Sequence, residues 1–200
     1  MRQDKKFNPG ECITSEHFAN VVCSFADELI TVDPHLHRIS SLDAIYSVPT
    51  NVFHAASYIS KWIKENIKNP ILIGPDMESK QWVNQVAKDS GAPYTVLVKS
   101  RLGDKNVKVS IPQINKYLAN HTPVIVDDII STAATMIETV EHLKEEGAKP
   151  AVCIGVHAVF AGNSYSELQK SGVANIITCN TIHHPSNGIN LNIQIAELLK

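Results

Sequence analysis

Apolar residues along this chain recur with two different spacings. Short runs rich in branched apolar residues predict buried strands, and they lie at 29–33, 71–73, 94–98, 124–126, 151–157 and 175–178. Between these runs, apolar residues repeat every three or four positions, which predicts helices at 14–25, 54–67, 79–88, 136–147 and 191–199. Strands that alternate with helices favour an α/β fold, in which helices cover both faces of a parallel sheet.

The stretch from Pro123 to Thr135 carries the clearest chemical signal. Its strand is followed by two adjacent carboxylates, Asp127 and Asp128, at the point where we expect the strand to end. A helix with one apolar face comes later, and Gly147 is placed to end it in a left-handed conformation. Between the carboxylates and the helix lie three small hydroxyl residues, namely Ser131, Thr132 and Thr135.

This order of residues suits a sugar phosphate. The first turn of a helix presents N–H groups without intrahelical acceptors and a partial positive charge, so it favours a phosphate. Thr132 and Thr135 can donate hydroxyl hydrogen bonds to the same phosphate. Asp127 and Asp128 repel a phosphate and are suited instead to sugar hydroxyls or to a magnesium ion. We therefore expect a ribose 5-phosphate site.

A purely structural explanation of the same residues also exists. Asp, Ser and Thr often cap the helix that follows a strand. Adjacent strand residues face opposite ways, however, so one of Asp127 and Asp128 should point inward. A buried unpaired carboxylate is costly, and this cost favours a ligand over a cap.

Val124 to Thr135 resembles the loop for phosphoribosyl pyrophosphate (PRPP) that type I phosphoribosyltransferases share with ribose-phosphate pyrophosphokinases, the PRPP synthetases. The family commonly has Gly where Ala134 stands, and often Asp where Ser131 stands. If position 134 requires a positive φ, Ala costs on the order of 1 kcal/mol relative to Gly. The ribose-5-phosphate-binding residues that the resemblance implies are Asp127, Asp128, Ser131, Thr132, Ala133, Ala134 and Thr135.

Two segments near the N-terminus resemble parts of the PRPP synthetase ATP site. Arg2-Gln3-Asp4 is similar to a segment that contributes to ATP binding, and Asp33-Pro34-His35 to a motif whose histidine contacts magnesium–ATP. The resemblance thus implies ATP binding by Arg2, Gln3 and His35. Without it, residues 2–6 fit a solvated terminus and His35 fits a surface turn.

Two further matches lie in the middle of the chain. Asp76 follows Gly74-Pro75, where PRPP synthetases place a metal-binding aspartate, although alone it fits a helix cap. Lys99 and Arg101 match the family's catalytic loop, in which they would stabilise the transferring phosphoryl group. Without the resemblance, this pair fits a solvated edge strand equally well. The implied metal is Mg²⁺, with His35 and Asp76 as its ligands.

The domain organisation follows from the same pattern. Residues 1–49 contain one predicted helix and one strand, which is too little to enclose a core. The resemblance identifies 1–49 as the remnant of an N-terminal PRPP synthetase domain that carries an ATP-site segment, a partial second α/β domain. It makes 50–185 the phosphoribosyltransferase-like catalytic domain, and 186–200 a C-terminal helix that packs on the N-terminal unit.

Composition limits the classes of partner. The chain has 200 residues, of which 44% are apolar, so it can bury a core. Its net charge of −2 gives no electrostatic case for nucleic acid, and no apolar run reaches membrane-spanning length. The cysteines lie far apart without a Cys-x-x-Cys pair, which favours reduced thiols in the cytoplasm.

These observations together predict a PRPP synthetase. The expected reaction transfers the diphosphoryl group of Mg–ATP to the C1 hydroxyl of ribose 5-phosphate and gives PRPP and AMP. The resemblance also implies a homo-oligomer. Two alternatives remain open at this point: a catalytically silent homologue or regulatory subunit, and a phosphoribosyltransferase that consumes PRPP.

Overall fold

The computed structural model of the chain describes residues 4–6, 8–36, 39–77, 79–102, 106–110, 117 and 120–199, with only the backbone described at 81, 98–102 and 106–110. The chain divides into two compact units. One comprises Met1–His54 with Ile195–Lys200, and the other Ala55–Gln194.

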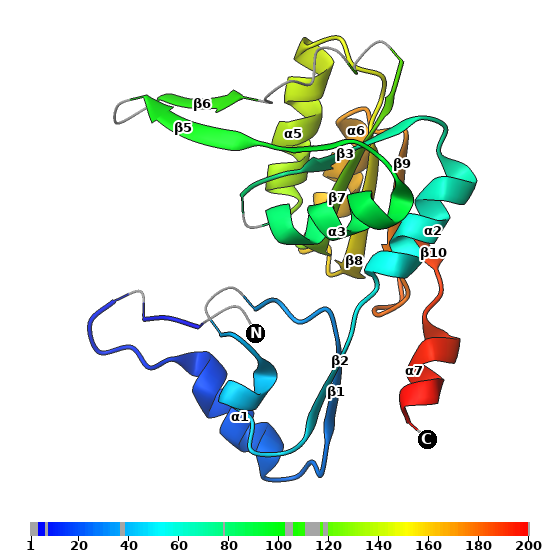
Figure 1. Ribbon diagram of the computed structural model, residues 1–200. Helices are drawn as coiled ribbons and strands as arrows, with labels where there is room; N and C mark the ends of the chain where they lie inside the picture. Colours follow the sequence, from blue (N-terminus) through cyan, green and yellow to red (C-terminus); the bar gives the residue numbers. More distant parts are fainter. Residues whose placement is uncertain are drawn as a thin grey trace. The chain divides into compact units, whose positions relative to one another are not determined.

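The larger unit is built on a six-stranded sheet in the order β10-β9-β8-β7-β3-β4, in which every neighbouring pair is parallel (Figure 1). This arrangement confirms the predicted α/β class and parallel sheet. The longest strand, β7, occupies an interior position between β8 and β3. The strands are β3 (Pro70–Gly74), β4 (Tyr94–Val96), β7 (Thr122–Ile130), β8 (Val152–Ala158), β9 (Asn175–Cys179) and β10 (Asn187–Ile189).

Helices cover both faces of this sheet. Connections between parallel strands are right-handed. The chain passes from β3 to β4 in one direction across the sheet, and from β7 to β8 and then to β9 in the other direction. The helix between β3 and β4 must therefore lie on the opposite face from the helices that follow β7 and β8. The first face carries α2 (Ala56–Asn66) and α3 (Lys80–Ser90), which pack on one another. The second carries α5 (Ala134–Glu145) and α6 (Ser164–Lys170).

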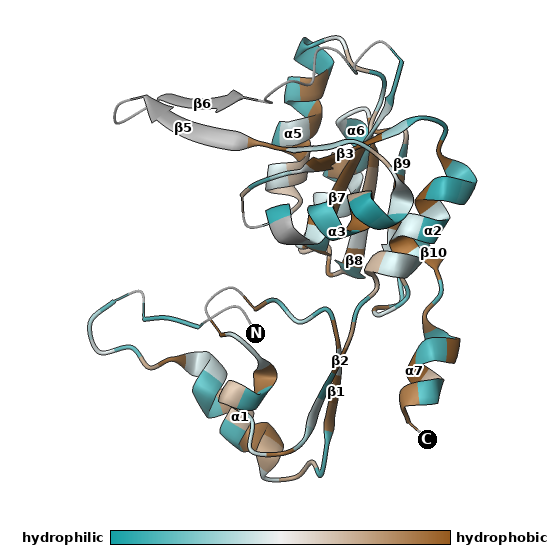
Figure 2. Cartoon of the chain, viewed as in Figure 1, coloured by the Kyte–Doolittle hydropathy of each residue, from teal (hydrophilic) through white to brown (hydrophobic). Residues whose placement is uncertain are grey.

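The strand sequences explain why both faces are buried. Ile71, Ile73 and Ile125 belong to an apolar core with Met136 and other residues of α5. Leu72 alternates with these residues along β3 and is also fully buried, so it serves the opposite face. Figure 2 shows the result as apolar central strands beneath helices with polar outer surfaces. Continuous apolar strands of this kind are typical of a sheet that is covered on both sides.

A separate antiparallel hairpin follows β4. It consists of β5 (Val98–Leu102) and β6 (Asn106–Ser110), with Lys99 opposite Val109 and Arg101 opposite Val107. The predicted strand 94–98 is therefore divided, because β4 ends at Val96 and the hairpin begins at Val98.

The smaller unit contains α1 (Thr14–Cys23), β1 (Leu29–Val32), the 3₁₀ helix η1 (Leu42–Ala44) and β2 (Thr50–Phe53). β1 and β2 pair in parallel, from Leu29 opposite Thr50 to Val32 opposite Phe53. β2 was not expected from the sequence. A short helix, α7 (Asn192–Leu198), lies at the end of the chain and crosses the boundary between the units.

α1 begins at Thr14, and Ile13 holds the N-cap position without a side-chain hydrogen bond. Large apolar side chains of the predicted helix 14–25 are largely exposed: Phe25 is 75% exposed and Val21 58%. The residues that α1 buries are Ser15 and Ala19, so the helix turns its small side chains inward.

Candidate functional site

The site predicted from the sequence lies where the order of the strands reverses. Chain connections run from β7 outward to β8 in one direction and from β3 outward to β4 in the other. In open α/β sheets, ligands bind at such a reversal, outside the carboxyl ends of the strands. Asp76 follows β3, and Asp127 and Asp128 lie near the end of β7, so the topology brings all three carboxylates to this crevice.

Asp127 and Asp128 are both half-buried at the end of β7. Burial raises the pKa of the Asp127 carboxyl group to about 8, and the negative charges of Asp128 and Asp76 add to the shift. The contribution from Asp76 shows that the ends of β3 and β7 converge electrostatically. The strand itself runs further than predicted, since β7 continues through both carboxylates to Ile130.

Gly155 permits the close approach of β7 and β8 beside Asp127. It lies directly opposite Asp127 in the parallel pair. A Cβ atom at position 155 would lie 2.6 Å from Cγ1 of Ile130 and 2.7 Å from its Cδ1. Such contacts are far inside van der Waals distance, so a side chain here would displace Ile130, which is the last residue before the hydroxyl loop.

Asp76 fits both explanations that the sequence offered. Its Oδ1 accepts a hydrogen bond of 2.9 Å from the N–H of Ser79, and the Ser79 hydroxyl donates to its main-chain carbonyl at 2.6 Å. It therefore caps the chain as it enters α3. The same carboxylate also contributes to the negative potential at Asp127. Capping fixes the position of Asp76 without removing its charge from the crevice.

The hydroxyl loop contains a backbone feature that corrects one expectation. The residue with a positive φ is Ala133 (φ 57°, ψ 6°), whereas Ala134 is the first residue of α5. The predicted cost of a left-handed alanine therefore falls at 133. The methyl of Ala133 is buried in the core, while Ala134 is exposed. A left-handed residue next to right-handed ones forms a concave set of N–H groups that favours an anion.

The start of α5 supplies further donors. Its first intrahelical bond runs from the N–H of Ile137 to the carbonyl of Ala133 at 2.9 Å. Within the described chain, no acceptor bonds to the N–H groups of residues 132–135. Thr132 is exposed, and Ser131 and Thr135 are half-buried, so the loop presents both amides and hydroxyls at the crevice.

The end of β8 also contributes polar groups. Nδ1 of His157 lies 2.9 Å from the hydroxyl of Thr181, and this hydroxyl donates to the carbonyl of Val156 at 3.1 Å. The loop after β9 is thus tied to the end of β8. His184 stacks on Phe160 with ring centroids 4.5 Å apart. Histidines in a polar loop give no sequence signal of such packing.

The residues predicted to bind ATP belong to other parts of the chain than the acidic corner and the hydroxyl loop. His35 lies in the smaller unit, two residues after Asp33, a buried residue with φ 36°. Oδ1 of Asp33 lies 2.9 Å from Nδ1 of His54. Arg2 and Gln3 lie outside the described residues. For Lys99 and Arg101 the structure gives the backbone position in β5.

Magnesium is the ion that the resemblance implies. Among the described residues, no group of three or more His, Cys, Asp or Glu side chains is arranged to hold a metal. The donor chemistry nevertheless fits, because Mg²⁺ binds through one or two carboxylates together with substrate phosphates. The mutual repulsion that raises the pKa of Asp127 is the kind of electrostatic cost that a cation relieves.

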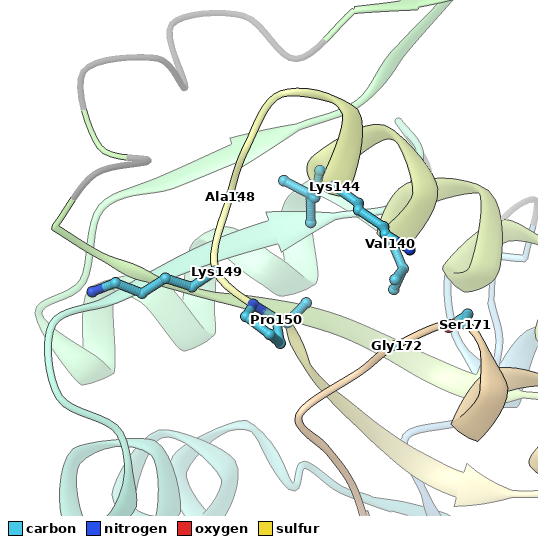
Figure 3. Close-up of a pocket in the computed structure, with 9 residues that line it drawn as sticks. Val140, Lys144, Ala148, Lys149, Pro150, Ser171 and Gly172 are labelled. Atoms are coloured by element: carbon cyan, nitrogen blue, oxygen red, sulfur yellow. The ribbon is translucent and has the colours of Figure 1, made fainter.

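A small pocket of about 110 Å³ lies elsewhere, at the opposite end of the strands (Figure 3). It is formed by the C-terminal half of α5, the entry into β8 and the end of α6, with Lys144 and Lys149 among mainly apolar residues. It shares no residue with the acidic corner or the hydroxyl loop. The candidate site therefore rests on the polar corner and not on this pocket.

Comparison with known proteins agrees with this geometry. Residues 41–194 match the family model described as the phosphoribosyl transferase domain. The ribose-phosphate pyrophosphokinase of Methanopyrus kandleri is 31% identical over 201 residues, which cover 100% of this chain and 67% of that protein. The enzyme of the same name from Methanosarcina acetivorans is 33% identical over 200 residues, covering 100% and 68%.

The same fold occurs in a solved structure. Phosphoribosylpyrophosphate synthetase from Mycobacterium smegmatis matches with a TM-score of 0.83 and 22% identity, over 99% of this chain and 66% of that chain. This chain thus spans about two thirds of the length of its relatives. Since both the domain match and the two archaeal relatives extend across the acidic corner and the hydroxyl loop, this chain belongs to the ribose-phosphate pyrophosphokinase family.

Proposed function

We propose that this protein transfers the diphosphoryl group of ATP to the C1 hydroxyl of ribose 5-phosphate, giving PRPP and AMP. One observation carries the proposal. The acidic pair Asp127 and Asp128 lies near the end of β7 at the reversal point of the sheet, a few residues before an N–H-lined turn whose left-handed residue is Ala133. The family membership of the chain supports the same reaction.

Each part of the loop has a distinct role in this reaction. The N–H groups of 132–135 and the hydroxyls of Ser131, Thr132 and Thr135 hold the 5-phosphate. Asp127 and Asp128 accept hydrogen bonds from the ribose hydroxyls. Because the pKa of Asp127 is raised to about 8, its protonated form can also donate to a sugar oxygen near neutral pH.

The transfer step is a displacement at phosphorus. The C1 oxygen attacks the β-phosphorus of ATP, the bond from that phosphorus to the α,β-bridging oxygen breaks, and AMP leaves while the C1 hydroxyl loses its proton. Mg²⁺ would neutralise the phosphate charge, with His35 and Asp76 as the proposed protein ligands. Lys99 and Arg101 would stabilise the transferring group, and Arg2, Gln3 and His35 would bind ATP. Positioning and charge neutralisation supply most of the catalysis in such reactions.

Several features of the protein's setting belong to the same proposal. We assign residues 50–185 to the catalytic domain, residues 1–49 to the ATP-binding segment and residues 186–200 to a helix that packs on it, within a cytoplasmic homo-oligomer. All four cysteines are free thiols, which suits a reducing compartment. Within the described ranges, no helix combines the length and apolar character that a membrane crossing requires.

The reaction is tested by measuring AMP release from ATP and ribose 5-phosphate with Mg²⁺ present. We expect AMP to form in proportion to PRPP, and Asp128→Asn and Lys99→Ala to lower the rate at least tenfold, an order-of-magnitude expectation for lost charge stabilisation. Asp128→Asn has a matched control in Asp89→Asn, because the Asp89 carboxylate lies on α3 and accepts from Gln85 of the same helix. Absence of AMP with the wild-type chain would refute the proposal.

A catalytically silent homologue is the second candidate. It is favoured by the alanine at the left-handed position of the loop, where the methyl restricts the backbone. Binding of ribose 5-phosphate without AMP release would select this candidate. Release of pyrophosphate from PRPP only when a base is added would instead identify a phosphoribosyltransferase.

A further inference from the structure

We infer that Ser164, the first residue of α6, is a positioning residue for the phosphate loop: its hydroxyl fixes the peptide plane that directs the N–H of Thr132 towards the phosphate. Ser164 lies more than thirty positions along the chain from the loop, and its side chain is 3% exposed. The inference rests on the proposed function, since it specifies how that site holds its sugar phosphate.

The loop is attached to the segment after β8 by its carbonyl groups. The carbonyl of Ile130 accepts a hydrogen bond of 2.9 Å from the N–H of Phe160. The next carbonyl, that of Ser131, accepts two: one of 3.0 Å from the N–H of Ala161 and one of 2.8 Å from the hydroxyl of Ser164. Ser164 is thus the only side chain among these three donors.

The direction of these bonds decides the direction of the amides. In a planar trans peptide, the carbonyl of one residue and the N–H of the next point in opposite directions. Because the carbonyls of Ile130 and Ser131 point towards Phe160, Ala161 and Ser164, the N–H groups of Ser131 and Thr132 must point away from that segment. On the side of β7 that faces β3, the pairing between the two strands ends at Ile73 and Ile125. The N–H groups of Ser131 and Thr132 therefore face the space beyond the end of β3, beside Asp76.

The anchoring segment is itself held under strain. Phe160 has φ 39°, which is unusual for an aromatic residue. Its ring stacks on His184 and meets Tyr165 edge to face with centroids 5.0 Å apart. A strained backbone persists only where the surroundings fix it, and such strain clusters at functional sites. The stacked rings therefore keep the three donors in register with the loop.

Removing the Ser164 hydroxyl separates positioning from stability. In Ser164→Ala the Ser131 carbonyl keeps the bond from Ala161, so no buried acceptor is left unpaired. The fold should remain intact, while the peptide plane before Thr132 loses one of its two restraints. Ser166→Ala is the matched control, because Ser166 lies on the same helix and donates to Asn163, away from the loop.

The experiment titrates ribose 5-phosphate calorimetrically into the full chain and measures KM for both substrates by AMP release. We expect Ser164→Ala to weaken ribose 5-phosphate binding about three- to tenfold, as one lost hydrogen bond implies. Its KM for ATP should stay at the wild-type value, and its unfolding midpoint should fall only slightly, because the Ser131 carbonyl keeps the bond from Ala161. Ser166→Ala should bind like the wild type, and Ser164→Thr, which keeps the hydroxyl, should restore most of the affinity.

The possible failures are distinguishable. If wild-type protein turns over but Ser164→Ala binds ribose 5-phosphate normally, or Ser166→Ala weakens binding equally, the positioning role is wrong and the proposed function stands. If the wild type binds ribose 5-phosphate but releases no AMP, the proposed reaction is wrong, and the binding series still decides the role of Ser164. A wild type that does not bind the sugar phosphate overturns both.

Discussion

The main-chain N–H of Asp128 donates a hydrogen bond of 3.0 Å to Oδ1 of Asp127. Such a bond favours the ionised carboxylate, yet the pKa of Asp127 is raised to about 8 because burial and the charges of Asp128 and Asp76 outweigh it. The acidic corner therefore retains a proton near neutral pH. A ligand that supplies positive charge or hydrogen bonds there changes the protonation of the pair.

This retained proton predicts a pH dependence of stability. Between about pH 4 and pH 8, Asp127 is ionised in the unfolded chain and protonated in the folded one, so the folded state binds more protons and the free energy of unfolding falls as pH rises. Asn cannot ionise, so Asp127→Asn does not lose stability in this way as pH rises. The free energy of unfolding of Asp127→Asn, compared with that of wild type, should increase from pH 4 to pH 8 by on the order of a few kcal/mol.

Urea denaturation at several pH values, monitored by circular dichroism, measures this effect. The curve of free energy against pH for Asp127→Asn should diverge upward from that of wild type, while Asp89→Asn should run parallel to wild type. A constant difference between Asp127→Asn and wild type across the range would show that Asp127 ionises at its ordinary pKa.

The left-handed residue of the loop predicts that glycine has a larger effect on stability at Ala134 than at Ala133. Ala134→Gly should lower the free energy of unfolding by about 0.5–1 kcal/mol, because Ala134 is helical and Gly is a poor helix former. Ala133→Gly should change it by less, since relief of the positive φ offsets the loss of a buried methyl. Denaturation of both variants checks this, and a stabilising Ala134→Gly would place the left-handed residue at 134.

The contact between Gly155 and Ile130 predicts a steric coupling. Gly155→Ala should destabilise the fold by about 1–3 kcal/mol, because its Cβ would overlap Cγ1 and Cδ1 of Ile130. Ile130→Ala removes both of those atoms, so the double variant should lose less stability than the two single losses added together. Strict additivity in this double-mutant cycle would contradict the close approach of β7 and β8 at this point.

The motif before His35 predicts a local dependence on Asp33. Asp33→Ala should destabilise by about 1–3 kcal/mol, because it removes the partner of His54 and leaves a side chain that tolerates φ 36° poorly. Asp33→Asn should cost less, since Asn accepts both the backbone conformation and a hydrogen bond. Thermal unfolding of the two variants and of wild type measures these differences. An Asp33→Ala variant as stable as wild type would rule out a structural role for Asp33.

Much of the architecture could be predicted because the central strands carry their own signal. Continuous apolar runs such as 124–126 identify a sheet covered on both faces, and the acidic and hydroxyl residues after that run identify the phosphate loop. Gly147, with φ 74°, ends α5 as its position suggested. These features depend on residues that are neighbours in sequence, so local pattern is enough to find them.

Other features depend on contacts between distant residues and leave no local signal. β2 forms because β1 provides a partner, and nothing in Thr50–Phe53 alone requires a strand. The positive φ falls at Ala133 and not at Ala134 because the methyl at 133 packs into the core while α5 begins one residue later. The donors from Phe160, Ala161 and Ser164 likewise meet the loop only after β8 and α6 are assembled.

The proposed sugar-phosphate site is tested most directly by a crystal structure of the full chain with ribose 5-phosphate bound. We predict that the phosphate lies against the N–H groups of 132–135 and that the ribose hydroxyls contact Asp127 and Asp128. A sugar phosphate bound away from this loop, with the acidic pair unliganded, would contradict this prediction.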